Sequence, residues 1–356
     1  MSYLSRAMVW LLPLATLVTL SSSRDGHTTS DSNAKSAIPY VDLHVDLPYQ
    51  YNYEHASFSR GTGQFAASMA REAGLCAVVL PLFVPARVSK HGPRTSDYEH
   101  SWERVDMALG QQEVFVRPGV EPAPGQVRTY YSFEGMGPFG DDPQSLERWA
   151  ARGVRLFGLV HNQDNALAAS SMDSHPYDSG LTALGRNVVD RIFELGGVVD
   201  VSHASDQTAK EVIEMALHAG HPVVATHSNA RQLLDHPRNL PDTLLNGIAE
   251  TGGVIGVNFH SAFLVAGRRA TLADVVKHIV YIAKRVGADH VALGSDFEGD
   301  IHPPRGLRTL SEVQHLVPAL RAAGLADADI RGIMGANALR ILAPRRPDLA
   351  EKCGSP

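Results

Sequence analysis

The sequence predicts a (β/α)₈ barrel with C-terminal helical additions, spanning residues 38–345 of the 356-residue chain. Eight short apolar runs recur along the chain, each followed by a loop. Several of the segments between them repeat their apolar residues with a helical period of 3.6. Histidine or acidic side chains follow most of the runs, at the positions where strands would end.

The predicted strands are rich in Val, Leu, Ile and aromatic residues, which is typical of parallel strands buried on both faces. In chain order they are Pro39–Leu43, Leu75–Phe83, Arg128–Phe133, Val154–Val160, Val198–Val201, Pro222–Thr226, Val254–Phe259 and His290–Gly294.

The predicted helices between the later strands carry one apolar face each. In Leu184–Leu195, for example, Val188, Val189 and Ile192 share a face. The others are Ala209–Leu217, Leu244–Ala249 and Leu272–Val286.

Two more helices are expected after the last strand. The pattern Ser311-x-x-Gln314 is that of a capping box, so we expect Ser311 to open the first helix and Gly324 to end it. The second is predicted over Asp329–Leu342.

A doubly wound open sheet is the alternative architecture. No Gly-x-Gly-x-x-Gly or P-loop pattern follows a predicted strand, which disfavours a nucleotide-binding sheet. Alternation of strands and helices therefore favours the barrel.

The N-terminal segment resembles an export signal. Ala7–Leu20 is a 14-residue apolar run behind Arg6, and a spanning helix needs about 20 apolar residues. We expect a signal peptide over residues 1–23, with an uncleaved membrane anchor as the alternative, then a flexible leader over 24–37. Residues 346–356 are expected to form a tail. The predicted location is periplasmic or secreted, or tethered to the membrane through the N-terminus.

Composition excludes several classes of protein. Hydrophobic residues make up 44% and charged residues 20% of the chain, which is typical of a packed globular protein. The net charge is −6, whereas a nucleic-acid-binding surface needs a positive field. The two cysteines make no metal site, but 17 histidines justify a search for one.

The polar residues after the predicted strands are His44, Asp46, Glu134, His161, His203, His227 and Asp296. In a (β/α)₈ barrel the C-terminal strand ends open onto one face, so these residues would converge. His44 and Asp46, two positions apart along a strand, point the same way.

Three histidines and two carboxylates form a ligand set suited to Zn²⁺, with Mn²⁺ or Co²⁺ as substitutes. Five ligands are too many for one tetrahedral zinc with an open position. They suit two ions that share a bridging carboxylate, the chemistry of metal-assisted hydrolysis. The candidate ligands are His44, Asp46, Glu134, His203 and His227, with Glu134 as the bridge.

Each residue also has a purely structural interpretation. A histidine at a strand end is commonly a hydrogen-bonded loop residue, and Asp46 or Asp296 suits a helix cap. Glu134, before Gly135, suits a turn. All of these would have to coincide at successive strand ends, which favours the metal site.

Several segments together resemble the membrane (renal-type) dipeptidases, which are binuclear zinc peptidases with a (β/α)₈ barrel. The resemblance extends over Val41–Leu342 and is carried by residues 41–48, 133–135, 200–203, 226–228, 238–242 and 294–297. It implies that His44 and Asp46 bind one zinc, that His203 and His227 bind the other, and that Glu134 bridges both.

The resemblance also implies three further roles. His161 would contact the substrate and stabilise the tetrahedral intermediate, and Arg238 would receive the terminal carboxylate of the substrate. Asp296 would transfer protons. From the residues alone, Arg238 would be a surface arginine paired with Asp235 or Asp242.

The chain departs from the family pattern at two positions. Val45 stands where the family commonly has Asn, and Glu298 where it commonly has Asp. Neither change removes a proposed ligand, but both can alter the hydrogen bonds around the site.

We therefore expect an exported metallo-dipeptidase with two Zn²⁺ per chain, in which a hydroxide bridging the metals attacks the scissile carbonyl. The C-terminal residue of the dipeptide is expected to be L or D, and a homodimer is one expected assembly. The alternatives are another binuclear barrel hydrolase, acting on an amide, lactone or phosphoester, and a non-catalytic secreted metal-binding protein.

Overall fold

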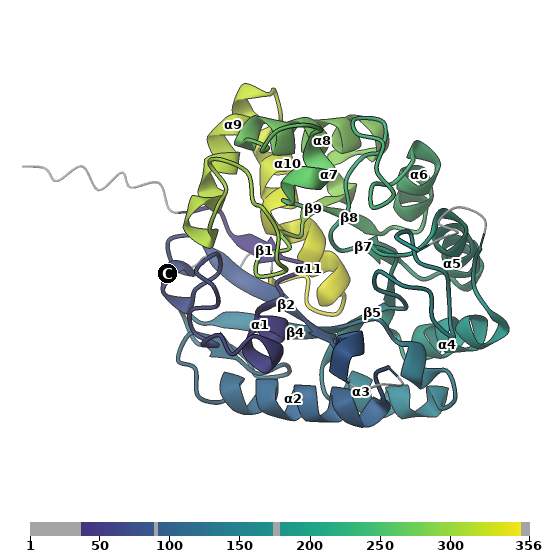
Figure 1. Cartoon of the computed structure of the whole chain (residues 1–356). Coiled ribbons are helices and arrows are strands. Elements are labelled where there is room, and N and C mark those ends of the chain that lie inside the picture. Colours follow the sequence, from purple (N-terminus) through teal and green to yellow (C-terminus); the bar gives the residue numbers. More distant parts are fainter. Residues whose placement is uncertain (1–36, 89–91, 174–178, 350–356) are drawn as a thin grey trace, which may run out of the picture. The chain divides into compact units, whose positions relative to one another are not determined.

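Eight parallel strands form a nearly closed ring in the computed structural model, which describes residues 37–88, 92–173 and 179–349. This arrangement confirms the predicted (β/α)₈ barrel (Figure 1). In ring order the strands are β1 (Tyr40–Asp42), β2 (Leu75–Phe83), β4 (Val127–Glu134), β5 (Val154–Gly158), β6 (Val198–Asp200), β7 (Val223–Ala225), β8 (Val254–Val257) and β9 (Val291–Leu293).

One additional strand was not expected. β3 (Phe115–Val116) pairs in parallel with β4 outside the ring path. It has two residues, which is too short for a periodic pattern to identify.

The first and last strands of the ring meet through individual backbone bonds in place of a regular ladder. The Leu43 amide donates to the Leu293 carbonyl at 3.0 Å, and the Asp46 amide donates to the Phe297 carbonyl at 2.9 Å. The Asp296 amide donates to the His44 carbonyl at 3.1 Å. We call this β1–β9 joint the seam, and residues of the candidate site lie directly on it.

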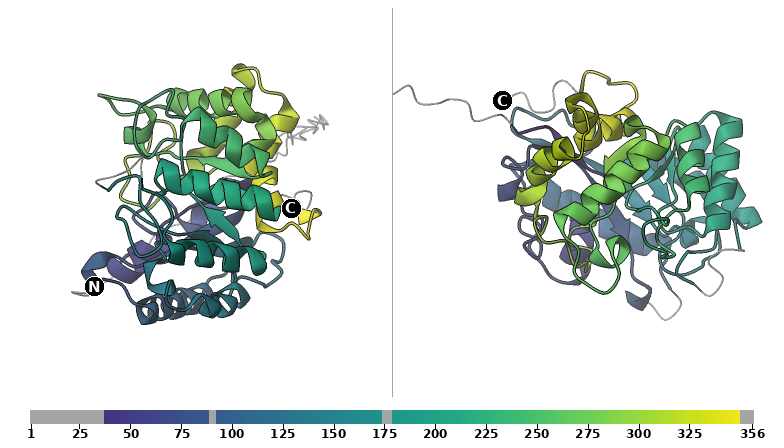
Figure 2. Two further views of the ribbon diagram at one scale, coloured as in Figure 1. Left: turned by 90° about the vertical axis from the view of Figure 1, so that its right-hand side faces the viewer. Right: turned by 90° about the horizontal axis from the view of Figure 1, so that it is seen from above.

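Helices cover the outside of the ring (Figures 1 and 2). Within the described ranges, none is long and apolar enough to cross a membrane. They are α1 (Leu47–Tyr53), α2 (Thr95–Leu109), α3 (Leu146–Ala151), α4 (Ala183–Glu194), α5 (Asp206–Ala219), α6 (Asp242–Glu250), α7 (Ser261–Leu264) and α8 (Leu272–Val286).

The C-terminal helical additions are present, but the predicted capping box is wrong. A 3₁₀ helix occupies Leu310–His315, and it has no side-chain cap. The Gln314 side chain instead accepts from the Ile38 amide at 3.1 Å and donates to the carbonyls of Ile38 and Ala73. The Gln314 side chain is therefore used in tertiary hydrogen bonds and is not available to cap the helix.

The remaining C-terminal helices are α9 (Leu316–Ala322), α10 (Asp327–Arg331) and α11 (Asn337–Leu342). A π-helical segment, Gly332–Ala336, joins the last two, so the predicted helix over Asp329–Leu342 is present with one irregular turn.

Helix α11 closes the end of the barrel where the strands begin. Its Leu339 and Ile341 lie in one buried cluster with inward-facing strand residues such as Val79 and Val254. Arg340 donates to the Gly252 carbonyl, just before β8. Polar side chains gather at the opposite end of the barrel, where the strands finish.

The expectations for residues 1–23 and 24–36 lie outside the described residues, as does the end of the tail from residue 350.

Candidate active site

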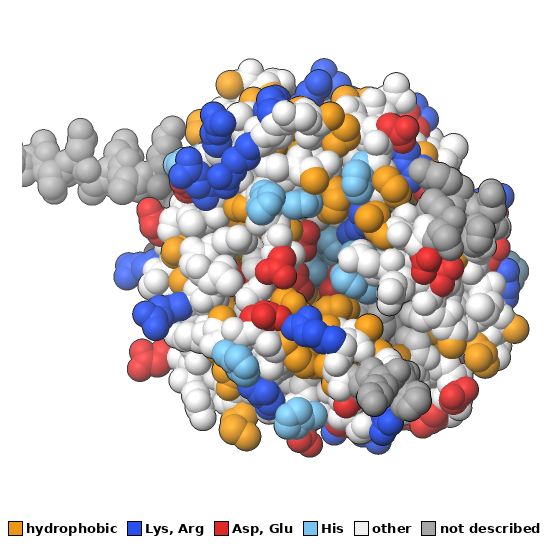
Figure 3. All heavy atoms as spheres, in the orientation of Figure 1, with side chains coloured by type: hydrophobic (Ala, Val, Ile, Leu, Met, Phe, Trp, Pro, Cys, Tyr) orange, Lys and Arg blue, Asp and Glu red, His pale blue; other side chains and the backbone are white. Residues whose placement is uncertain are grey.

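A cavity of about 320 Å³ opens at the C-terminal ends of the strands. Figure 3 shows histidine and acidic side chains gathered around this hollow. It is lined by Asp46, Tyr49, Phe83, Glu134, His161, Asn162, Met172, His203, Arg238, His260, Phe263, Asp296, Gly299, Asp300 and Ile301.

The structure brings the five predicted metal ligands together. His44 and Asp46 follow β1, Glu134 ends β4, and His203 and His227 follow β6 and β7. All five are buried. One carboxylate oxygen, Glu134 Oε1, lies 2.9 Å from His203 Nε2, 3.6 Å from His44 Nε2 and 3.7 Å from His227 Nε2. Glu134 thus occupies the central position expected of a bridging carboxylate.

Hydrogen bonds fix which ring nitrogens of two histidines carry a proton. His203 Nδ1 lies 3.1 Å from the Asn162 side-chain oxygen, which only accepts, so Nδ1 donates. His227 Nδ1 lies 2.8 Å from the Thr226 hydroxyl oxygen, while that hydroxyl donates to Asp200 Oδ2 at 2.5 Å. Nδ1 of His227 therefore also donates.

Both Nε2 atoms are consequently left with lone pairs, and they lie 3.0 Å apart. Two lone pairs facing each other at this distance are repulsive unless a cation lies beside them. Burial, followed by nearby positive groups, lowers the pKa of His203 and His227 well below the usual value. Neutral imidazole is the form that binds a metal.

His44 provides a separate observation that fits a metal. It is 1% exposed, and neither ring nitrogen has a hydrogen-bond partner among the described residues. Such an orphaned polar group is costly without a ligand. Burial lowers its pKa, but the carboxylates of Asp46 and Glu134 outweigh this effect and raise the pKa to about 10, so a bound metal ion would have to displace a proton from this ring. Its Nε2 lies 3.5 Å from Asp46 Oδ2.

Among the described residues three groups could hold a metal ion, two of which share Glu134, while the third contains His44, Asp200 and His227. The two that share Glu134 are His44, Asp46 and Glu134, and Glu134, His161 and His203; the ligand atoms of each group lie within 4.8 Å of one another. The donor set of imidazoles and carboxylates fits zinc or a related divalent ion.

Two buried aspartates support the ligand-bearing strand ends in the same manner. Asp42 Oδ1 accepts from the amides of His44 at 3.2 Å and Ser295 at 2.9 Å. Asp200 Oδ1 accepts from the amides of Ser202 and Thr226, both at 3.0 Å. Each carboxylate thus joins the end of its own strand to the end of the neighbouring strand, close to a candidate ligand. Sequence reasoning missed both, although each stands two or three residues before a predicted histidine ligand.

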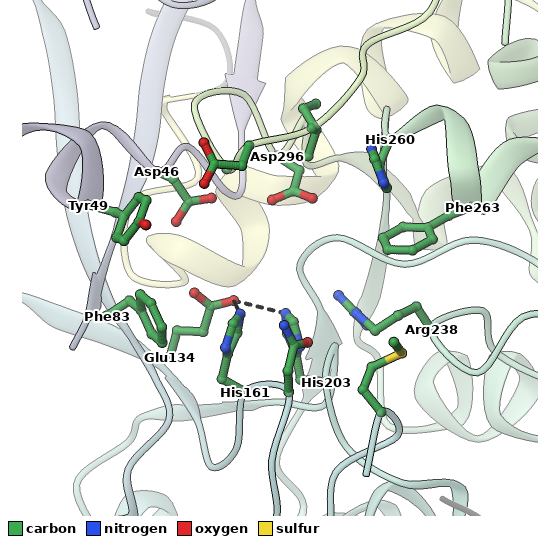
Figure 4. A pocket seen from close by; sticks show the side chains of 15 residues that line it. Asp46, Tyr49, Phe83, Glu134, His161, His203, Arg238, His260, Phe263 and Asp296 are labelled. Carbon is green, nitrogen blue, oxygen red and sulfur yellow. Dashed lines mark hydrogen bonds and ion pairs between the residues drawn. The ribbon is translucent and has the colours of Figure 1, made fainter. Parts of the chain in front are cut away.

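Asp46 does not act as a helix cap. It occupies the N-cap position of α1, but its side chain makes no cap hydrogen bond. Its carboxylate is directed into the cavity beside Asp296 (Figure 4).

Asp296 lies against the candidate metal site, beside Asp46. The Asn258 amide donates to Asp296 Oδ2 at 2.9 Å. Burial and the neighbouring Asp46 carboxylate raise the pKa of Asp296 well above its usual value. A Cβ at Gly299 would lie 2.5 Å from Asp46 Oδ2 and 2.7 Å from Asp296 Oδ1, so glycine is needed for this close approach.

Arg238 is a buried cavity residue, and its interpretation as a surface arginine paired with Asp235 or Asp242 is wrong. It is 3% exposed, Nη2 donates to the His227 carbonyl at 3.4 Å, and Nη1 has no partner within the described part of the chain. Asp242 instead accepts from Tyr281. A buried guanidinium with a free donor suits an anionic ligand such as a carboxylate.

His161 lies beside the bridge position. Its Nε2 is 4.0 Å from Glu134 Oε1, and its ring lies against the rings of Phe83 and His203. Burial lowers its pKa, which favours the neutral ring with one donor.

The side walls of the cavity were not anticipated from the sequence. In Figure 4, Tyr49 and Phe83 lie on one side of the cavity, while His260 and Phe263 lie on the other, next to Arg238. Tyr49 belongs to α1, Phe83 ends β2, and His260 and Phe263 lie at the start of and within α7. They follow no recurring sequence pattern, so only their position in the fold identifies them.

Comparison with known proteins identifies the family of this chain. The chain matches the family model of the membrane dipeptidases, peptidase family M19, over residues 31–347. The chain belongs to the membrane dipeptidase family. This confirms the resemblance stated above, and a member of this family with such a site is a metallo-dipeptidase, a hydrolase.

Individual relatives agree with this membership. An uncharacterized dipeptidase of Schizosaccharomyces pombe is 30% identical over 85% of this chain and 80% of its own length. Dipeptidase aclJ of Aspergillus oryzae is 33% identical over 62% of this chain and 52% of its own length, so the match spans about half of that relative. The crystal structure of dipeptidase AC, a metallopeptidase of family M19, is 25% identical with a TM-score of 0.75, covering 86% of this chain and 98% of that one.

Proposed function

We propose that this membrane dipeptidase relative is a binuclear zinc enzyme that hydrolyses dipeptides and uses Arg238 to select a free C-terminus. The observation that carries the proposal is the convergence of three histidines on Glu134 Oε1, with two unprotonated Nε2 atoms 3.0 Å apart. A bound cation relieves that arrangement without rearranging the buried site.

In this proposal His44 and Asp46 would hold one zinc ion, His203 and His227 would hold the other, and Glu134 would be shared by the two sites. When bound, the two ions activate water at neutral pH and polarise a carbonyl group. The protein contributes the fixed ligand geometry, supported from below by Asp42 and Asp200.

Arg238 would bind the terminal carboxylate of the substrate through its unpartnered Nη1. Because Arg238 lies beside Phe263 and His260, the C-terminal side chain would contact that wall (Figure 4). The N-terminal residue would then extend toward Tyr49 and Phe83. A cavity of about 320 Å³ with a carboxylate anchor matches a substrate of two residues.

Asp296 would accept the proton of the attacking water and deliver it to the leaving amine. Its carboxylate lines the cavity beside Asp46 and is held by the Asn258 side chain at 2.9 Å, which places it next to the proposed metal site. The neutral ring of His161 would donate a hydrogen bond to the oxygen that becomes negative in the transition state.

Metal removal tests this function directly. We expect the protein to release amino acids from a panel of L,L and L,D dipeptides and to leave tripeptides intact. Prior chelation should abolish the activity, and adding zinc should restore it because the ligand set remains in place. Failure of the fully metal-loaded protein to cleave any dipeptide would reject the proposed substrate, and metal binding without hydrolysis of any bond would favour the non-catalytic alternative.

Replacing Arg238 by Met separates a dipeptidase from another binuclear hydrolase. Loss of a hydrogen bond to a charged group costs about 1.5–3 kcal/mol, which corresponds to roughly a 10- to 150-fold rise in KM. The matched control is Arg285→Met on α8, where the arginine faces Asp242 and lies outside the cavity. A normal KM in the Arg238 variant would favour a substrate without a terminal carboxylate.

The exported location expected from residues 1–23, the acceptance of a D residue and the homodimer stay predictions. The substrate panel tests stereochemistry.

A further inference from the structure

The turn after β9 is held in an unfavourable backbone conformation. Asp296, Glu298 and Asp300 have φ values of 64°, 71° and 55°, the left-handed region that residues with a side chain rarely adopt. Three such residues alternate within five positions, and two of them, Asp296 and Asp300, line the cavity. Such strain persists only when surrounding contacts enforce it.

The third residue, Glu298, points away from the cavity and is 1% exposed. Its carboxylate accepts three backbone hydrogen bonds from the segment after α1. Oε2 accepts from the Thr62 amide at 2.5 Å, and Oε1 accepts from the amides of Gln64 at 3.1 Å and Phe65 at 2.8 Å. None of the ion pairs among the described residues involves Glu298, so these amides are the groups that compensate its buried charge.

The backbone of Glu298 is tied to the same region. Its amide donates to the Gln64 side-chain oxygen at 3.0 Å, and its carbonyl accepts from the Gln50 side chain at 2.7 Å. The Gln50 side chain also lies 3.3 Å from Asp300 Oδ1. The turn is thus fixed through both the side chain and the main chain of one residue.

The fit around the carboxylate is close. A Cβ at Gly61, whose φ is +53°, would lie 2.5 Å from Cδ of Glu298. The segment 61–65 therefore wraps the carboxylate without space for another atom.

We propose that Glu298 is a positioning residue, whose buried carboxylate holds the strained turn 296–300 so that Asp296 faces the metal site. It does not touch the cavity and is not itself a catalytic group. The proposal rests on the proposed function, because its catalytic consequence operates through Asp296. It also gives a role to the glutamate at one of the two positions where this chain departs from the family pattern.

Glu298→Gln in the metal-loaded protein tests the proposal. The amide retains the shape of the carboxylate but places an NH₂ group against backbone donors, so at least one hydrogen bond is lost. We expect kcat to fall about a hundredfold, as for other small displacements of a reacting group. KM and metal content should stay unchanged, because Arg238 and the five ligands are untouched. Hydrogen exchange should accelerate in segments 61–65 and 296–300.

Glu211→Gln on α5 is the matched control. Glu211 also accepts a backbone hydrogen bond, from the Leu181 amide at 3.0 Å, but it lies outside the cavity. It should leave kcat and the exchange of both segments unchanged. An unchanged kcat in Glu298→Gln, or a loss of activity that follows a loss of metal, would overturn the proposal.

Gly61→Ala provides a second variant if Glu298→Gln does not fold, because the added methyl group displaces the carboxylate without changing its chemistry. It should lower kcat with metal retained, and a normal kcat with normal exchange would contradict the proposal. If the wild-type protein cleaves no dipeptide, the proposed function fails on its own. Hydrogen exchange then decides the role of Glu298, and unchanged exchange of segment 296–300 in Glu298→Gln would overturn it.

Discussion

Replacing Glu134 by Gln is expected to remove bound metal and to lower dipeptide hydrolysis by about a thousandfold or more. Glu134 Oε1 lies within 4.0 Å of the Nε2 atoms of four histidines, so this one oxygen is common to both halves of the proposed metal centre. An amide keeps the shape but carries no negative charge to offset two divalent ions. Metal analysis of the purified variant, together with kcat, measures both effects.

The control for this substitution is Glu147→Gln, which changes the same group at an exposed position on α3. It should retain the metal content and activity of the wild type. A Glu134 variant that keeps two metals per chain would contradict the bridging role, even if it were inactive.

Asp296→Asn is expected to retain both metals and to lose about a hundred- to ten-thousandfold in kcat, the range for removal of a general acid–base group. Asparagine preserves the volume beside Gly299 but cannot carry a proton between the water and the leaving amine. Burial and the neighbouring Asp46 raise the pKa of Asp296 in the wild type. The substitution leaves Asp46 and the buried surroundings of position 296 unchanged. Measurement of kcat at matched metal content isolates the chemical effect.

Asp289→Asn, at an exposed position before β9, is the corresponding control and should behave as wild type. An Asp296 variant with substantial kcat would remove this residue from proton transfer. Loss of metal in that variant would instead indicate that Asp296 supports the ligand Asp46.

The strands were predictable because buried parallel strands are apolar on both faces. Runs such as Leu75–Phe83 and Val254–Val257 stand out in the sequence for that reason. The capping box at Ser311 failed because Gln314 is used by residues more than 200 positions away. Local patterns cannot detect such competition from tertiary contacts.

The candidate ligands were predictable because a barrel brings all strand ends to one face. Their supports were not, because each depends on a partner distant in sequence. Asp42 bonds to Ser295, and Glu298 bonds to Thr62 and Phe65. The local sequence around an aspartate at a strand end does not show which neighbouring strand its side chain will bond to.

The position of the candidate metal ligands next to the seam between β1 and β9 has a consequence for the stability of the protein. His44 and Asp46 belong to the first strand, whereas Glu134, His203 and His227 belong to strands on the other side of the site. In the proposed function, ions held between them would tie β1, which forms one side of the seam, to strands across the barrel, and their binding would raise the free energy of unfolding. In a chelated preparation the seam would open more readily. Opening would expose two unpaired strand edges, which can pair with other molecules. Loss of metal would thus shorten the useful life of a stored sample through aggregation as well as inactivate it.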